Sequence, residues 1–280
     1  MYIRRSSVLI LISLILLSYM DPVIAAHPGL RIAMVQMNVA DGNLVQNMKY
    51  ADRSIRKAAK MNVDMICFPE AADLGWLCQS AREDALTIPG KYTDMLSGLS
   101  KKYNVWISGG CLEKDGDKTY NSCFLIDRTG KIVLKYRKIN TLPDLTAHLY
   151  DRGTADGIMV VETEFGVIGM TICADNSNIE YPEMVADLGA WLLITPHGYA
   201  AEEDDLADNA ITFMNRIKNI AEKTNLWVVG TNTGLSLVAG GKWKGYLHSG
   251  CSTIANPKGK AVAIGRFKEN DLIIYDIPPE

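Results

Sequence analysis

Apolar residues recur along the chain with two different spacings, which predict helices and strands. From residue 43 to 61 the apolar side chains follow one another at three- and four-residue steps with Lys and Arg between them, which predicts an amphipathic helix. Further helices are predicted over residues 92–103, 181–188 and 205–224. Short apolar runs of strand length occupy residues 30–37, 63–68, 105–111, 120–126, 131–136, 158–162, 167–173, 191–195 and 226–230.

The order of these elements predicts the fold. Two stretches of the chain each mix strand–helix alternation with hairpins, and the turns 114–117 and 127–130 carry the Asp and Gly that tight hairpins need. The last segment, 251–277, adds three more strands around short turns, and no linker interrupts the pattern. We therefore predict one α/β domain over residues 27–280, a four-layer αββα sandwich of two mixed β-sheets with helices on the outside.

The first 26 residues have a different character. Arg4 and Arg5 precede an apolar run over residues 8–20, and Ala25 and Ala26 then offer small side chains to a peptidase. The run is shorter than the roughly 20 residues that a membrane-spanning helix needs, so an uncleaved anchor is the weaker alternative. We expect a signal peptide over residues 1–26, no stable membrane insertion after its removal, and a secreted or periplasmic protein.

Composition bears on two questions: whether the protein binds nucleic acid, and whether its cysteines form disulfides. The 280-residue chain is 48% hydrophobic, enough for a sizeable core, and has a net charge of −3 without a basic block, which makes nucleic acid a poor candidate partner. The six cysteines are dispersed through apolar runs, which is typical of small core residues. Cys111 and Cys123 flank a predicted turn, and a disulfide between them stays open because sequence cannot supply their separation.

Three polar side chains stand at the ends of predicted strands, where ligands bind in α/β architectures. Glu70 follows the strand 63–68, Lys138 follows the strand 131–136, and Cys173 closes the strand 167–173. Taken singly, Glu70 and Lys138 are better explained as solvated surface charges. A thiol, however, is a poor nucleophile until a base or a cation increases its thiolate character. Glu70 supplies such a base, and Lys138 supplies such a cation.

These residues carry a resemblance to a known family. Phe68-Pro69-Glu70, Tyr136-Arg137-Lys138 and Cys173-Ala174-Asp175, in this order, resemble the three signatures of the carbon-nitrogen hydrolase (nitrilase) superfamily. Cys-Ala-Asp is similar to the amidase-like branches rather than to true nitrilases. Segments near the opening strand and near Tyr120, Tyr181 and Gly250 also match, so the resemblance covers residues 30–275.

The resemblance implies a reaction and assigns the residues. Cys173 attacks a small linear amide or carbamoyl compound to form a thioester, Glu70 acts as general base and acid, and Lys138 with the backbone N–H of Ala174 holds the oxyanion. His197 is expected to line the substrate pocket. No cofactor is implied, and none of the four histidines has the spacing of a metal site. By the same resemblance, the protein assembles as a homodimer or a higher homo-oligomer.

The sequence departs from the family pattern in the loop after Lys138. Many members carry a second glutamate there, but Thr146 or Ala147 stands at that place, and Asp144 or His148 are the candidate substitutes. This loss leaves open a catalytically impaired relative that only binds amide-like ligands. A thioester-based acyltransferase is another alternative, although the membrane-embedded acyltransferases of the superfamily carry several spanning helices.

Overall fold

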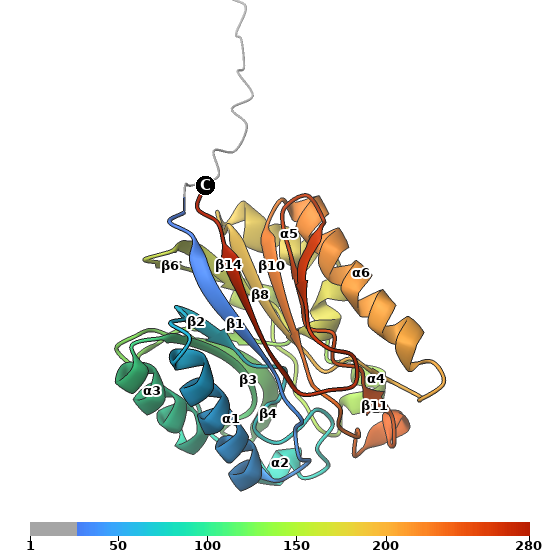
Figure 1. Cartoon of the computed structure of the whole chain (residues 1–280). Helices are drawn as coiled ribbons and strands as arrows, with labels where there is room; N and C mark the ends of the chain where they lie inside the picture. The colour runs from blue at the N-terminus through green and yellow to red at the C-terminus, as the bar shows by residue number, and fades with distance from the viewer. Residues whose placement is uncertain (1–26) are drawn as a thin grey trace, which may run out of the picture.

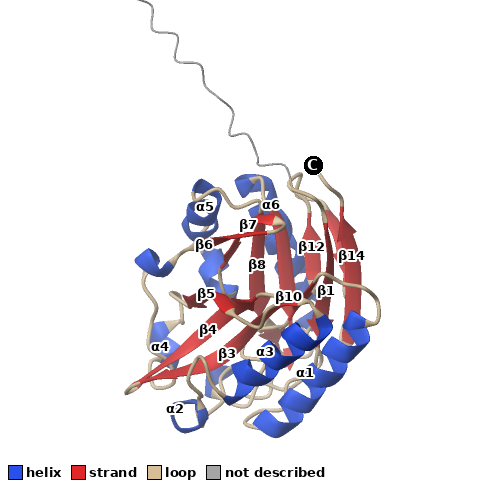
Figure 2. Cartoon of the chain, turned by 90° about the vertical axis from the view of Figure 1, so that its left-hand side faces the viewer, coloured by secondary structure: helices blue, strands red, loops and turns tan. Residues whose placement is uncertain are grey.

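The computed structural model describes residues 27–280 as two stacked six-stranded sheets with helices on both outer faces (Figure 1). Figure 2 shows α1 and α3 on one side of the sheets and α5 and α6 on the other. The chain ends beside the point where the described residues begin, since the backbone N–H of Glu280 donates to the carbonyl of His27. The predicted αββα sandwich is confirmed, whereas the predicted leader 1–26 lies outside the described residues.

The first sheet places the ends of two strands at one edge. Its order is β14-β1-β2-β3-β4-β5. Strands β1, β2 and β3 are parallel, and β4 and β5 each reverse direction, so β5 runs the same way as β2. The carboxyl ends of β2 and β5, which precede Glu70 and Lys138, therefore point the same way. The bounds are β1 (Leu30–Gln36), β2 (Met65–Cys67), β3 (Trp106–Asp115), β4 (Lys118–Ile126), β5 (Ile132–Arg137) and β14 (Asp271–Ile277).

The second sheet repeats this plan in the order β13-β12-β10-β8-β7-β6, with β7, β8 and β10 parallel. Two features were not predicted. Strand β14 returns to pair with β1 of the first sheet, and a separate two-stranded sheet joins β9 (Ala200–Ala201) to β11 (Leu247–His248). The other bounds are β6 (Val160–Thr163), β7 (Gly166–Met170), β8 (Leu192–His197), β10 (Trp227–Asn232), β12 (Thr253–Ala255) and β13 (Ala261–Ile264).

The helices begin and end at recognisable residues. The side chain of Asn43 accepts a hydrogen bond from the N–H of Gln46 and so caps α1, and Asn104 and Asn225 end α3 and α6 in the left-handed conformation. The bounds are α1 (Leu44–Ala59), α2 (Ala81–Asp84), α3 (Lys91–Tyr103), α4 (Pro143–Thr146), α5 (Glu180–Asp187) and α6 (Leu206–Thr224), with 3-10 turns η1 (Ala155–Gly157), η2 (Cys173–Ser177) and η3 (Gly241–Trp243).

Both faces of the first sheet are buried, because helices cover one and the second sheet covers the other. Alternate residues of β1 therefore pack into different clusters, with Met34 between the sheets and Val35 under the helices. The same alternation separates Cys111 from Cys123: Cys123 lies opposite Gly110, so Cys111 faces the other side of the sheet. The two thiols lie in different clusters and form no disulfide.

Between residues 27 and 280, no helix is long and apolar enough to cross a membrane.

Candidate active site

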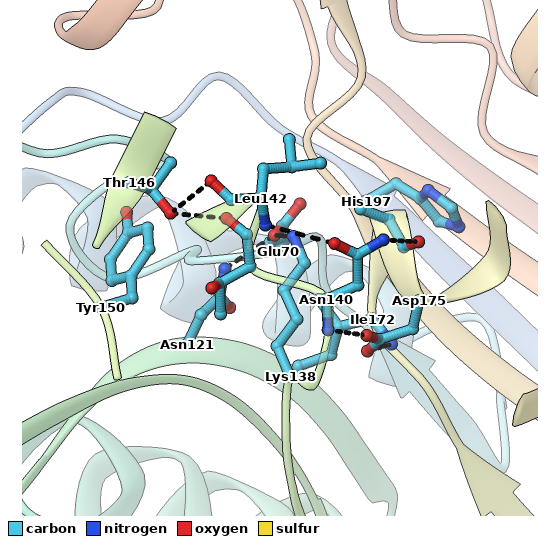
Figure 3. A network of polar contacts seen from close by, with 12 residues as sticks. Glu70, Asn121, Lys138, Asn140, Leu142, Thr146, Tyr150, Ile172, Asp175 and His197 are labelled. Carbon is cyan, nitrogen blue, oxygen red and sulfur yellow. Dashed lines mark hydrogen bonds and ion pairs between the residues drawn. The ribbon is translucent and has the colours of Figure 1, made fainter. Parts of the chain in front are cut away.

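The structure brings Glu70, Lys138 and Cys173 together at one edge of the stacked sheets. The Glu70 Oε1 atom accepts hydrogen bonds from Lys138 Nζ at 2.5 Å and from Asn121 Nδ2 at 2.7 Å (Figure 3). The same carboxylate lies near the Cys173 thiol, and its charge raises the pKa of that thiol. The side chains of Glu70 and Lys138 are 0% and 2% exposed, so bulk water does not weaken their attraction.

The sequence predicted that Cys173 ends a strand, but β7 already ends at Met170. Cys173 begins the 3-10 turn η2 instead, and its φ is 45°. A side chain other than glycine is strained in this left-handed region and persists there only when its surroundings hold it. The sharp turn sends the chain away from the strand direction at the residue that bears the thiol.

A cavity of about 250 Å³ opens onto the cysteine and the lysine. Its wall combines bulky apolar side chains with hydroxyl and amide groups, and no carboxylate lines it. A separate hollow around Gln36 and Arg53 holds none of the three residues above. The lining of the first cavity is Trp76, Lys138, Leu142, Cys173, Ala174, Ser177, Gly198, Tyr199, Ala200, Asn209 and Trp243.

The electrostatics of the group keep the resting thiol protonated. Burial and then the Glu70 carboxylate raise the pKa of Cys173 to about 12, although Lys138 and the backbone N–H of Gly198 act in the opposite direction. In the resting site Lys138 favours the Cys173 thiolate, whereas the negative charge of Glu70 opposes it. Burial by itself lowers the pKa of Lys138, but the Glu70 and Asp175 carboxylates outweigh it and hold that pKa above its ordinary value. Lys138 is accordingly a cation at neutral pH.

A match to a family model shows which protein family the chain belongs to. The model described as carbon-nitrogen hydrolase matches residues 31–280. The chain belongs to the carbon-nitrogen hydrolase family. It is 25% identical over 262 residues to the Omega-amidase NIT2-B of Xenopus laevis, with 88% of each chain covered. It is 27% identical over 184 residues to the Omega-amidase NIT2 of Homo sapiens, where the alignment covers 60% of this chain and 63% of that relative.

Solved structures of two proteins share the fold of this carbon-nitrogen hydrolase chain. Nit3 of Saccharomyces cerevisiae, a member of branch 10 of the nitrilase superfamily, superimposes with a TM-score of 0.77 at 20% identity and covers 90% of this chain and 91% of its own. An amidase from Nesterenkonia sp. gives a TM-score of 0.77 at 16% identity and covers 91% and 93%. At these identities the likeness supports the fold alone.

Asp175 joins the two segments that carry Lys138 and Cys173, a role that sequence reasoning missed. Its Oδ1 accepts from the backbone N–H groups of Ile139 at 3.1 Å and Asn140 at 2.6 Å, and its Oδ2 accepts from Tyr136 Oη at 2.8 Å and from the N–H of Ile172 at 3.2 Å (Figure 3). The carboxylate is fully buried. It therefore fixes the turn after β5 against the turn after β7.

Replacing Asp175 by Asn is expected to loosen both segments. An amide supplies one acceptor oxygen in place of two, so a buried donor loses its partner at a cost of about 1–3 kcal/mol of unfolding free energy. We expect kcat for an amide substrate to fall about tenfold or more because small misplacements of reacting groups are costly. Chemical denaturation and steady-state kinetics measure the two effects. The exposed Asp156→Asn variant should change neither, and an unaltered Asp175→Asn enzyme would contradict this role.

Two glycines allow the Glu70 segment to approach its neighbours closely. A Cβ atom on Gly110 would lie 2.7 Å from the carbonyl oxygen of Pro69 and 2.8 Å from the Cα of Glu70. A Cβ atom on Gly198 would lie 3.2 Å from Glu70 Oε2. The order Gly109-Gly110 within an apolar strand was a signal of close backbone approach that the sequence contained. Both positions therefore help to set where the Glu70 carboxylate lies.

The two residues expected to bind substrate have different surroundings. Ala174 lines the cavity beside Cys173. The side chain of His197 is fully buried outside that lining, with Nε2 within 3.2 Å of Thr195 Oγ1 and its ring 4.9 Å from the ring of Phe213. Burial, with Arg216 and Lys138 nearby, lowers the pKa of His197 well below its ordinary value. His197 thus contributes to the wall through its neighbour Gly198 rather than through its imidazole.

In the loop after Lys138, none of the residues expected at the place of the second glutamate brings a carboxylate to the cavity. Thr146 is buried at the end of α4 and its Oγ1 donates to the carbonyl of Thr141 at 2.5 Å (Figure 3). Asp144, Ala147 and His148 are exposed and do not line the cavity. Glu70 is thus the carboxylate that lies beside Cys173 and Lys138. Within the part of the chain that the structure describes, no three His, Cys, Asp or Glu side chains are grouped to hold a metal ion.

Proposed function

We propose that this chain hydrolyses the carbon–nitrogen bond of a small linear amide or carbamoyl compound through a thioester on Cys173. One observation carries the proposal: Lys138 donates to the buried Glu70 carboxylate, the same carboxylate raises the pKa of the Cys173 thiol, and Cys173 and Lys138 line one cavity. A nucleophile, a base and a cation grouped beside one cavity are the parts that acyl transfer needs. Membership of the carbon-nitrogen hydrolase family supports the reaction class.

The first half of the reaction forms the acyl-enzyme. Because the resting thiol is protonated, its proton passes to Glu70 as sulfur attacks the carbonyl carbon of the amide. The negative charge that develops on the substrate oxygen is stabilised by Lys138 and by the backbone N–H of Ala174, which lies in the first turn of η2 where helical N–H groups lack internal partners. Glu70 then returns the proton to the leaving nitrogen, and ammonia or an amine departs.

The second half removes the acyl group. Water donates a proton to Glu70 and attacks the thioester carbon, Lys138 again stabilises the oxyanion, and the thiol recovers its proton as the acid is released. Among residues 27–280 no carboxylate lines the cavity, and Glu70 serves as base in both halves of the reaction. The reaction as written uses neither a metal ion nor an organic cofactor.

Named relatives support the choice of substrate. Two of the similar proteins are omega-amidases, and the amidase from Nesterenkonia sp. has been solved with butyramide and with acrylamide added at its active-site cysteine. A cavity of about 250 Å³ suits amides of this size.

We also propose that the leader 1–26 is removed, that the mature protein is secreted or periplasmic, and that it forms a homodimer or a higher homo-oligomer.

Release of ammonia from a panel of small linear amides tests the proposed reaction. We expect turnover by the mature protein and none by Cys173→Ala, because the nucleophile is lost. Cys78→Ala is the matched control, since Cys78 is a buried thiol that does not line the cavity. Binding of amides by the unmutated protein without any ammonia release would favour the impaired, ligand-binding alternative. Transfer of the acyl group to an added amine in preference to water would favour the acyltransferase.

A further inference from the structure

A second cavity, of about 320 Å³, shares no lining residue with the cavity at Cys173. Four cations line it, from β4, β5 and the segment that follows α4, and no carboxylate lines it. These cations are Lys118, Lys135, Arg137 and Arg152. The proposed reaction uses none of the four, so this concentration of positive charge has no role in amide hydrolysis.

The strand register places the cations of β4 and β5 on the face of the sheet opposite to the active site. Lys135 lies opposite Phe124, which packs in the cluster under the outer helices. Alternate residues of a strand share a face, so Lys118 on β4 and Arg137 on β5 face this side as well. Asn121, which bonds the active-site carboxylate, has the opposite parity and faces between the sheets. A ligand in this cavity therefore lies outside the catalytic pocket.

The fourth cation reaches the cavity because the chain returns to the end of β5. The backbone N–H of Gly153 donates to the carbonyl of Lys138 at 2.8 Å, and Arg152 Nε donates to the carbonyl of Ile139 at 2.9 Å. A Cβ atom on Gly153 would collide with the carbonyl oxygen of Arg137. Glycine at this position therefore lets the segment that bears Arg152 lie against Arg137.

Two of the cations are held in place by carboxylates outside the lining. Glu113, whose side chain is 2% exposed, accepts from Lys135 Nζ at 2.5 Å and from Arg137 Nη2 at 2.6 Å. Arg137 Nη2 also donates to Asp115 at 2.7 Å, and the guanidinium carbon lies 3.9 Å from the centre of the Tyr120 ring. These contacts balance the charges of Lys135 and Arg137 and fix where the two side chains lie.

The other two cations have no such balance. Among residues 27–280, no carboxylate lies within ion-pair distance of Lys118 or Arg152. Asp151, the chain neighbour of Arg152, already pairs with Arg82 at 2.7 Å. The side chains of Lys118 and Arg152 are exposed as well as lining the cavity. Their charges are therefore available to an anion that enters from solvent.

We propose that this cavity binds a small soluble compound that carries a phosphate group. A phosphate monoester has a charge of about −1.5 to −2 at pH 7 and three strong acceptor oxygens, which matches the two unbalanced cations. The guanidinium of Arg152 presents a planar fork of N–H donors that fits phosphate oxygens. The cations are confined to one cavity and form no stripe, which favours a small compound over a nucleic-acid strand. The inference does not rest on the proposed hydrolysis of amides.

Calorimetric titration of the full mature chain with inorganic pyrophosphate, the probe for this chemistry, tests the site. We expect one pyrophosphate per chain. Lys118→Met combined with Arg152→Met should weaken binding at least about tenfold, because charge-assisted hydrogen bonds are lost. Lys118→Glu changes a single exposed side chain and should weaken binding at least as much. Lys101→Met combined with Lys102→Met removes the same charge from the exposed end of α3 and should keep the affinity.

Two further measurements decide where the anion binds and in what form. Arg216→Met removes a cation that bonds Ser177 and Tyr199 of the other cavity, and it should leave pyrophosphate binding unchanged. Vesicles that contain phosphatidic acid should not capture the protein. The inference is overturned if pyrophosphate does not bind, if the Lys101 and Lys102 pair weakens binding equally, if Arg216→Met abolishes binding, or if the vesicles capture the protein.

Discussion

Replacing Glu70 by Gln is expected to lower amide turnover by about 1,000-fold while making Cys173 easier to alkylate. General base catalysis typically contributes 100-fold to 10,000-fold, and Gln cannot accept the thiol proton. The same substitution removes the negative charge that, after burial, does most to raise the pKa of Cys173. The pKa of the thiol must then fall, because Lys138 remains beside it and favours the thiolate. Catalysis and intrinsic thiol reactivity should therefore change in opposite directions.

The pH dependence of alkylation by iodoacetamide, followed at Cys173 by peptide mass, measures the second effect. For the unmutated protein the rate should still be rising steeply at pH 10, since the pKa of Cys173 is about 12. In Glu70→Gln the curve should shift to lower pH. Glu162→Gln alters an exposed carboxylate on β6 and should leave both curves unchanged. A Glu70→Gln protein whose turnover and alkylation fall together would contradict the assigned role of Glu70.

Replacing Lys138 by Met is expected to lower both activity and stability. The substitution leaves the buried Glu70 carboxylate without its cation, and breaking a buried pair in this way costs about 3–5 kcal/mol of unfolding free energy. Because the pKa of Lys138 is raised, its stabilising contribution is fully present below the ordinary lysine pKa and is lost only at higher pH. Turnover should fall at least about 1,000-fold, since the oxyanion loses its cation.

Urea denaturation at pH 7 measures the stability change, and steady-state kinetics measures the loss of activity. Lys131→Met removes an exposed lysine before β5 and should cost less than about 0.5 kcal/mol, as surface substitutions usually do. The double variant Glu70→Gln with Lys138→Met removes both charges, so it should recover much of the stability but none of the activity. A single Lys138→Met variant that is as stable as the unmutated protein would contradict a buried ion pair.

The sequence was sufficient to predict the sandwich and to single out three residues, Glu70, Lys138 and Cys173, that follow its strands, for an identifiable reason. Apolar runs ended abruptly at Pro69-Glu70, at Lys138 and near Cys173, and two reversals of direction align β5 with β2. Strand order fixes which strand ends lie at the same edge of a sheet. The local apolar patterns therefore predicted the arrangement of the two sheets correctly. The bounds of α1, α3 and α6 also followed, because each has a continuous apolar face.

Other features depended on contacts between residues far apart in the chain. Arg216 is an ordinary arginine on the partly exposed face of an amphipathic helix until its bonds to Ser177 and Tyr199 are seen. The four donors that meet at Asp175 come from β5 and the turn after it in one sheet, and from the turn after β7 in the other. Strand β14 reaches β1 across almost the whole chain. The raised pKa of Cys173 results from burial, which outweighs the charge of Lys138. Spacing in the sequence carries none of this information.

A covalent adduct on Cys173 is the most direct test of the central claim that this residue forms a thioester with help from Glu70 and Lys138. The mature protein is mixed with a small amide, quenched in acid within the first turnovers, and analysed by intact mass and peptide mapping. We predict one acyl group on Cys173, lost again as product forms, and no adduct on Cys173→Ala. Ammonia release with no adduct at any quench time, or with equal rates in Cys173→Ala, would contradict the mechanism.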